Sequence, residues 1–231
     1  MVVQACLNGD RDAAVPLTPE QLGEDARACV AAGAVSLHAH PRDPDGLETF
    51  DAEHTAAALR AMRPSGAEIS FSTGLWITGG DVDARLRAIS AWTELPDVVS
   101  LNVFEEGFED MAALLRRRGI GIEAGVWNTL GVEALAATGV KAHRILVEPH
   151  TETPAEAVQL AAEIDAALDD ACITAPRLHH GTGPATWAVL DAAVPLGRDI
   201  RIGLEDVLTL PDGRRAPDNA SLVVEAVLRY T

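Results

Sequence analysis

Residues 34–43, AVSLHAHPRD, carry an apolar run into two histidines and then a proline. The run is typical of a buried strand, and the strand should end at Pro41 because proline has no backbone N–H. Side chains two residues apart on a strand point the same way, so we expect His38 and His40 to lie on one face. That spacing lets both imidazoles bind one metal ion, and two ordinary buried histidines are the alternative. The position of this strand in the chain favours the metal site.

Apolar runs of this kind occur eight times, and amphipathic helical segments separate them. We expect strands at 2–7, 35–40, 68–72, 98–103, 121–126, 142–148, 177–180 and 200–205. Helices should begin near residues 18, 51, 81, 107, 129, 153, 184 and 218. Strands that are nearly continuous in Val, Ile and Leu are typical of parallel sheets covered on both faces. Eight such units without a break in composition predict the α/β class, with residues 1–231 forming a single (β/α)8 TIM barrel. An open doubly wound sheet is the alternative. The Gly-x-Gly-x-x-Gly motif that would support such a sheet does not follow the first strand.

The composition limits where the protein acts and what it binds. The formal net charge of the 231 residues is -17, which disfavours nucleic acid and anionic membranes as partners. The three cysteines share no metal-type spacing and predict a reduced, intracellular setting. No signal peptide or transmembrane span is predicted, so we expect a cytoplasmic protein.

In barrels of this kind the catalytic residues lie at the C-terminal ends of the strands. These ends are repeatedly polar in this chain, which favours one shared site over unrelated buried histidines. The residues are Asn8, His38, His40, Ser72, Thr73, Asn102, Glu123, Glu148, His150, His179, His180, Arg201, Glu205 and Asp206. The turn at 72–74 could bond an anion or simply cap the next segment. The glycine-bearing turn at 179–183 is a candidate cradle for a phosphate or carboxylate.

The last predicted strand supplies a third metal ligand. Its alternation places Arg201, Gly203 and Glu205 on one face, directed into the barrel. A buried pair of Arg201 with Glu205 is the structural alternative. Strand eight of a closed barrel adjoins strand one, which adjoins strand two, so Glu205 can approach both histidines. Three protein ligands with one open position are typical of a catalytic zinc site, and ions such as Mn²⁺ would also accept these ligands.

The segments 38–43 and 201–206, taken with 16–20, 32–34, 69–74, 100–102, 122–123 and 218–223, resemble the β-keto acid cleavage enzyme family. The founding activity of this family is 3-keto-5-aminohexanoate cleavage, and the similarity runs over essentially the whole chain. The resemblance implies a (β/α)8 barrel that binds a divalent metal, most often Zn²⁺. It also implies a reaction in which a β-keto acid and acetyl-CoA give acetoacetate and a new acyl-CoA. A metal on the 3-keto oxygen would stabilise the enolate formed when C2 loses its proton.

The same resemblance implies a role for individual residues. His38, His40 and Glu205 correspond to metal ligands. The catalytic group corresponds to Arg201, Glu123 and Asp206, with Asp206 as the candidate general base. We assign substrate binding to Ser72, Thr73, Asn102 and Arg11. Short loops indicate a compact member of the family. Arg11 stands where the aminohexanoate enzyme has an acidic residue, so we expect a neutral or acidic β-keto acid instead.

Two other functions fit parts of the pattern. A metal-dependent hydrolase or lyase on a TIM barrel is the main alternative, since His-x-His also opens metallohydrolase sites. A non-enzymatic small-molecule binding protein would leave the inward-facing Arg201 and Glu205 unexplained. Barrels of this type often associate through their helices, so we expect a homo-oligomer.

Overall fold

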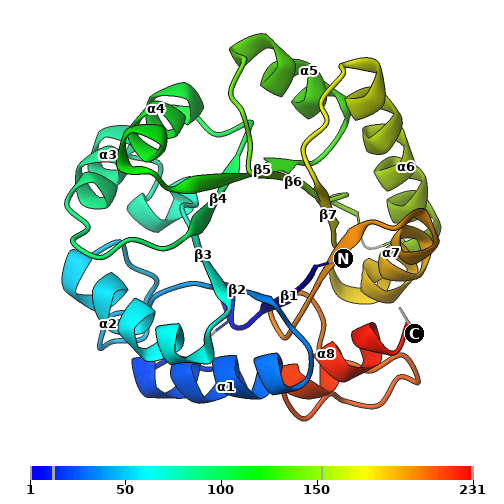
Figure 1. Cartoon of the computed structure of the whole chain (residues 1–231), viewed down its shortest axis with the longest axis horizontal. Helices are drawn as coiled ribbons and strands as arrows, with labels where there is room; N and C mark the ends of the chain where they lie inside the picture. Colours follow the sequence, from blue (N-terminus) through cyan, green and yellow to red (C-terminus); the bar gives the residue numbers. More distant parts are fainter. Residues whose placement is uncertain (1, 12–13, 152, 230–231) are drawn as a thin grey trace.

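The computed structural model describes residues 2–11, 14–151 and 153–229, which form a closed barrel of eight parallel strands. Each strand pairs with the next in chain order, and β8 pairs with β1 to close the ring, as Figure 1 shows. The strands are β1 (Val3–Cys6), β2 (Ser36–Ala39), β3 (Glu68–Ser72), β4 (Val98–Asn102), β5 (Gly121–Val126), β6 (Arg144–Val147), β7 (Arg177–His179) and β8 (Asp199–Ile202). The predicted single (β/α)8 TIM barrel is confirmed.

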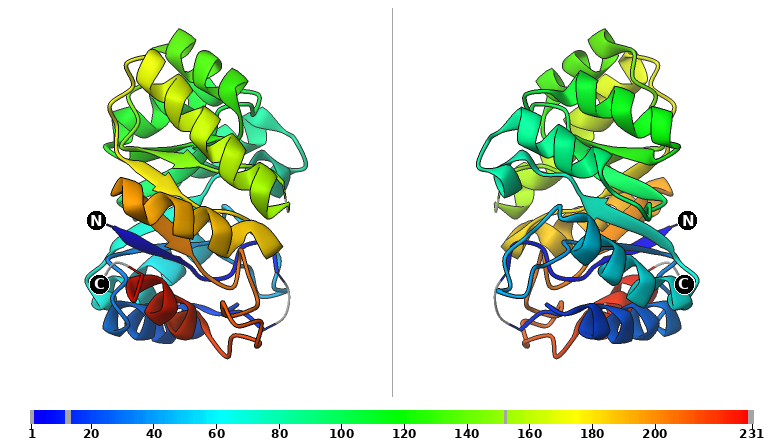
Figure 2. Two further views of the ribbon diagram at one scale, coloured as in Figure 1. Left: turned by 90° about the vertical axis from the view of Figure 1, so that its right-hand side faces the viewer. Right: turned by 90° about the vertical axis from the view of Figure 1, so that its left-hand side faces the viewer.

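Within the described residues, eight α-helices surround the barrel (Figure 1). They are α1 (Pro19–Ala31), α2 (Ala52–Met62), α3 (Val82–Ser90), α4 (Phe108–Arg118), α5 (Thr129–Thr138), α6 (Pro154–Asp170), α7 (Thr186–Ala193) and α8 (Asn219–Val227). Thr18 begins α1 through a capping box. Its hydroxyl accepts a hydrogen bond from the Gln21 backbone amide, and the Gln21 side chain accepts one from the Thr18 backbone amide. Figure 2 shows that β1 begins and α8 ends at the same end of the barrel.

The eighth strand is shorter than the sequence predicts. It ends at Ile202, whereas the alternation predicted a strand that continues to Glu205. A Cβ atom on Gly203 would collide with the backbone carbonyl of Cys6, so the chain passes β1 closely at this glycine. The amides of Asp206 and Val207 then both donate to the Gly203 carbonyl at 3.0 Å, which turns the chain. The prediction that Glu205 lies on the strand is therefore wrong, and the side chain is placed by a turn after β8.

Alternation along the strands separates an apolar outer layer from a polar interior. Leu37, Ile69 and Val99 are fully buried in the apolar clusters that join the strands to the helices. Glu123 is also fully buried, but it accepts hydrogen bonds from Gln4 (2.7 Å) and Ser70 (2.5 Å) inside the barrel. The barrel interior thus holds a polar layer beneath the C-terminal ends of the strands.

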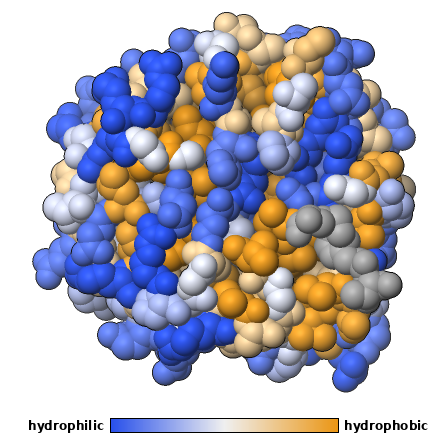
Figure 3. Space-filling view, viewed as in Figure 1, coloured by the Kyte–Doolittle hydropathy of each residue, from blue (hydrophilic) through white to orange (hydrophobic). Residues whose placement is uncertain are grey.

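The opposite end of the barrel, where the strands begin, faces the reader in Figure 3, and its hydrophilic residues separate hydrophobic patches. An ion pair between His143 Nε2 and Glu68 Oε2 (3.1 Å) lies at this end. Among the helices of the described residues, none has both the length and the apolar character needed to cross a bilayer.

Asp25 provides a test of the packing between α1 and α8. Its carboxylate accepts from Asn219 Nδ2 at 2.6 Å, and burial raises its pKa from 3.8 to about 6. A raised pKa means that protonated Asp25 stabilises the fold below about pH 4, and that this contribution is lost as the pH rises through 6. We expect Asp25→Asn to raise the free energy of unfolding at pH 8 by about 1–2 kcal/mol, with little effect at pH 4. Urea denaturation measures both values, with the exposed Asp83→Asn as a control. A less stable Asp25→Asn at pH 8 would contradict the argument.

Candidate functional site

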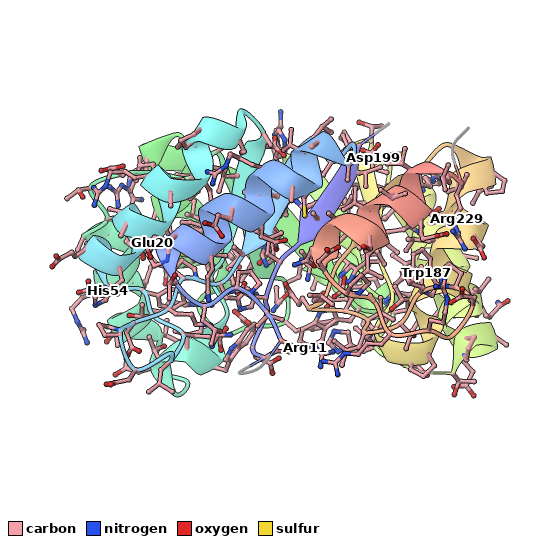
Figure 4. All side chains as sticks on the ribbon, turned by 90° about the horizontal axis from the view of Figure 1, so that it is seen from below. Arg11, Glu20, His54, Trp187, Asp199 and Arg229 are labelled. Atoms are coloured by element: carbon pink, nitrogen blue, oxygen red, sulfur yellow. The ribbon has the colours of Figure 1, made fainter. Side chains whose placement is uncertain are left out.

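The polar residues at the C-terminal ends of the strands meet at one end of the barrel. In the side view of Figure 4, Arg11 lies at this end and Asp199, at the start of β8, lies at the other. We call this end the mouth, and it is where barrel enzymes carry out their chemistry.

Three predicted metal ligands converge at the mouth. His38 lies on β2, His40 directly follows it, and their Nε2 atoms are 3.1 Å apart. Glu205 approaches both from the turn after β8, with Oε1 3.5 Å from His40 Nε2 and Oε2 3.9 Å from His38 Nε2. One ligand atom from each side chain lies within 4.8 Å of the other two. The structure therefore brings together the histidine pair and the carboxylate expected from the closure of the barrel.

These distances fit a divalent ion. Two nitrogen ligands of a tetrahedral zinc ion, each about 2.0–2.1 Å from the metal, lie about 3.3 Å apart. The separation of the two Nε2 atoms, 3.1 Å, is close to this value. Glu205 Oε2 is buried and has no hydrogen-bond partner, so a ligand oxygen is available on the third side. The donor set of two imidazoles and one carboxylate is one that zinc accepts.

Partners at the other ring nitrogen fix the orientation of both histidines. Ser70 Oγ donates its only proton to Glu123, so it accepts the hydrogen bond from His38 Nδ1 at 3.1 Å. His40 Nδ1 is hydrogen-bonded to Glu48 Oε1, and Trp76 Nε1 donates to the other oxygen of Glu48 at 2.9 Å. With a proton on each Nδ1, Nε2 is the nitrogen of each ring that binds a metal once it is unprotonated.

Glu48 and Ser70 were not predicted from the sequence as site residues. Ser70 had a findable signal, because it lies two residues before Ser72 on β3 and must share its inward face. Glu48 had none, because a short antiparallel bridge between Arg42 and Glu48 folds the loop back over His40.

The charges at the mouth differ between the two histidines. Burial, reinforced by Arg201, lowers the pKa of His38 well below its usual value. Burial also lowers the pKa of His40, but Glu205 and Glu48 outweigh that effect and raise it to about 9. Burial raises the pKa of Glu205, whereas Arg201 and the two histidines hold it well below its usual range. Glu205 is therefore a carboxylate at neutral pH, as metal binding requires.

A second polar group lies beside the metal-type cluster. Arg201 is buried; its Nη2 contacts Glu205, and its Nε lies 3.4 Å from Asp206 Oδ2. Cys6 Sγ donates to the same Asp206 oxygen at 2.9 Å, and burial raises the pKa of this thiol so that it stays protonated. His180 Nδ1 lies 3.5 Å from Asp206 Oδ2. Asp206 is thus surrounded by one guanidinium, one thiol and one imidazole.

The other predicted residues are placed less directly. Glu123 lies one layer below, bonded to Ser70 and Gln4, and within the described residues no hydrogen bond or ion pair joins it to Arg201 or Asp206. The remaining four make local contacts. Ser72 Oγ accepts from the Gly74 amide (3.3 Å), Thr73 Oγ1 donates to the Ser100 carbonyl (2.5 Å), Asn102 Nδ2 donates to Glu105 (2.9 Å) and Arg11 Nε donates to the Glu205 carbonyl (3.2 Å).

The turn at 179–183 is not free to cradle an anion with all its amides. The Gly183 amide donates to the Asp206 carbonyl at 2.8 Å, which ties this turn to the loop after β8. Alternation along β7 directs His179 out of the barrel, where its Nε2 lies 3.3 Å from Asp165 Oδ1. His180 is fully buried beside Asp206.

The fold and the site define a (β/α)8 barrel with a candidate His-His-Glu metal site beside a buried Arg-Asp pair. The chain belongs to the β-keto acid cleavage enzyme family, whose sequence model matches residues 1–229. It is 24% identical to a 3-keto-5-aminohexanoate cleavage enzyme of Fusobacterium nucleatum, over 94% of this chain and 85% of that enzyme.

Solved structures of ObcA share the fold. One is a ternary complex with a C4-CoA adduct and oxalate, with a TM-score of 0.74, 20% identity and 95% of this chain covered. Another is a binary complex with oxaloacetate, with a TM-score of 0.73, 21% identity and 95% of this chain covered. The chain spans 64% and 63% of these two ObcA chains, slightly less than two thirds of their length.

Glu48 offers a test of the cluster that leaves its three ligands intact. Glu48→Gln removes the charged acceptor at His40 Nδ1, and losing such a partner typically lowers metal affinity 10–100-fold. We expect a loss of this size for zinc in a chelator competition assay. His40→Ala should bind no stoichiometric metal while keeping the far-UV circular dichroism spectrum, and His54→Gln on α2 should behave as the unaltered protein. Full zinc affinity in Glu48→Gln, or stoichiometric zinc in His40→Ala, would contradict the ligand assignment.

Proposed function

We propose that this protein is a divalent-metal-dependent β-keto acid cleavage enzyme. It condenses a β-keto acid with acetyl-CoA to give acetoacetate and a new acyl-CoA. The observation that supports this most is the position of the His38, His40 and Glu205 cluster beside Arg201 and Asp206, in a chain of this family. The metal-type ligands and a carboxylate base then face one substrate.

In this proposal His38, His40 and Glu205 hold the ion, with zinc as the preferred metal. When bound, the ion supplies a Lewis acid that favours the enolate of the keto acid. Ser70 and Glu48 hold the imidazoles in the tautomer that presents Nε2. Glu123 acts on the site through Ser70 rather than by touching the substrate.

Asp206 is the proposed general base that removes the proton from C2. The carboxylate is the form that accepts a proton, and Arg201 lies beside it with Nε 3.4 Å from Asp206 Oδ2. Arg201 also contacts Glu205, so one guanidinium holds both the base and a metal ligand in place. Its planar fork equally suits the carboxylate of the keto acid. Ser72, Thr73 and Asn102 are the proposed contacts for the remainder of the substrate.

Asp206→Asn tests the role of the base. The amide keeps the size and the Arg201 contact but cannot accept the C2 proton, so we expect kcat to fall at least ~100-fold. Zinc content should stay unchanged because Asp206 is not a ligand. An unchanged kcat would remove Asp206 from the role of general base.

Arg11 is the proposed recognition group for the acyl end of the substrate. Its Nε donates to the Glu205 carbonyl, which places a cationic side chain beside the metal-type cluster. A cation there disfavours an amino-substituted keto acid, and the ObcA complex with oxaloacetate gives an example of a dicarboxylic ligand on this fold.

We expect neutral and acidic β-keto acids to be used with higher kcat/KM than 3-keto-5-aminohexanoate. Arg11→Gln should raise KM for the acidic members roughly tenfold, since about 1.4 kcal/mol of charge interaction is lost. The exposed Arg214→Gln, whose partner is Asp212, is the matched control. A preference for the amino-substituted acid in a substrate panel with acetyl-CoA would exclude this specificity.

Metal analysis of the purified protein, combined with a coenzyme A acyl-exchange assay, tests the function itself. Bound metal with acyl exchange supports the cleavage enzyme. Bound metal with hydrolysis or lyase activity alone supports the alternative metal-dependent hydrolase or lyase. Neither metal nor turnover would overturn both enzymatic functions.

A further inference from the structure

Four ionisable side chains form a line from the proposed base to the surface of the barrel. Asp206 Oδ2 lies 3.5 Å from His180 Nδ1, and His180 Nε2 lies 3.6 Å from Glu148 Oε1. Glu148 Oε1 lies 3.3 Å from His150 Nε2. Carboxylates and imidazoles therefore alternate along the line. Each N–O distance exceeds the length of an ordinary hydrogen bond by only a few tenths of an ångström.

The two inner members of this line are buried, and exposure increases over the two outer ones. The side chains of Asp206 and His180 are 3% and 1% exposed, that of Glu148 is 18% exposed and that of His150 is 47% exposed. Trp127 fixes the position of the two outer residues. Its Nε1 donates to Glu148 Oε2 at 3.2 Å, and its ring stacks on that of His150 with the ring centroids 4.1 Å apart. The line thus starts at a buried carboxylate and ends at an imidazole in contact with solvent.

His180 is the unusual member. Both of its ring nitrogens are buried without a hydrogen-bond partner, although each faces a carboxylate. A buried polar group without a partner is costly, so a purely structural histidine at this position would be expected to close at least one of these gaps. Its neighbour His179 differs in position and in the number of such atoms: it lies on the outside of the barrel, and only its Nε2, 3.3 Å from Asp165, is buried without a hydrogen-bond partner. Catalytic hydrogen bonds are often long before the substrate binds and tighten when it does.

We propose that His180, Glu148 and His150 form a proton path that connects Asp206 to solvent. This inference rests on the proposed function, in which Asp206 takes the C2 proton of the keto acid. The C–H bond breaks, its electron pair stays on the carbon framework as the enolate, and the proton forms an O–H bond on Asp206. Asp206 passes that proton to His180 Nδ1, and His180 releases the proton on Nε2 to Glu148. Glu148 passes a proton to His150, which exchanges with water. Reversal of the same transfers brings a solvent proton back to Asp206, so the side chains end each cycle unchanged.

The path predicts that the proton returned to acetoacetate comes from solvent. The zinc-loaded protein is run with a β-keto acid and acetyl-CoA in D₂O, the reaction is stopped early, and the mass of the acetoacetate is corrected with an enzyme-free control. We expect deuterium at C2 in most wild-type turnovers. In His180→Gln the amide can bond both carboxylates but cannot relay a proton as imidazole does, so the original proton returns and the deuterated fraction falls at least threefold.

His150→Gln is the second variant, because a surface substitution leaves the fold intact. We expect a fall of about twofold, which a higher concentration of buffer restores by delivering protons to Glu148. His143→Gln is the matched control: His143 is equally exposed, at 47%, and also pairs with a glutamate, but it lies at the other end of the barrel. It should keep the wild-type deuterated fraction.

The deuterated fraction of the acetoacetate distinguishes a proton path from a purely structural role of His180 and His150. A lower kcat in His180→Gln or His150→Gln with an unchanged deuterated fraction would overturn the path and leave the proposed function standing. Should His180→Gln fail to fold, the His150→Gln fraction and its rescue by buffer decide the question. Absence of acyl exchange in the wild-type protein would overturn the proposed function and the path with it.

Discussion

The structure of the mouth depends on the burial of one carboxylate, Glu123, in the middle of the barrel. Burial raises the pKa of Glu123, and the hydrogen bonds that its oxygens accept offset part of the cost of removing this group from water. Ser70 and Gln4 donate to the two oxygens, and Arg144 Nε lies 3.0 Å from Oε1. Because the single proton of Ser70 is committed to Glu123, the hydroxyl can only accept from His38. The nitrogen of His38 that carries the proton is therefore determined one layer below the mouth.

Closure of the barrel is the second constraint, and it acts through the backbone. The register pairs Gln4 with Arg201 and Ala5 with Ile202, so Gly203 lies against Cys6 where β1 ends. Only a residue without a side chain can pass Cys6 so closely, and the turn that follows begins there. Glu205 and Asp206 are consequently carried over the end of β1 toward β2. A larger residue at 203 would displace the third metal-type ligand and the proposed base together.

Much of this arrangement could be predicted from the sequence because it follows from periodicity and topology. Eight apolar runs specify the barrel, and closure places Glu205 near His38 and His40 whether it lies on a strand or on a turn. Contacts made by loops could not be predicted in the same way. Glu48 reaches His40 through a bridge that has no period, and Gly203 ends β8 through a close approach that alternation does not report. The depth of Glu123 in the barrel depends on register, which sequence patterns leave open.

Arg201 joins the two halves of the site through the two oxygens of Glu205. Its Nη2 and His40 Nε2 both face Oε1, whereas Oε2 is buried without a partner and faces His38. An ion bound at Oε2 would leave the guanidinium on Oε1, so the metal and Arg201 need not compete for one atom. The same guanidinium also faces both oxygens of Asp206. Removing Arg201 would thus free Glu205 to rotate and take the guanidinium away from Asp206, so one side chain positions both the candidate metal ligand and the proposed base.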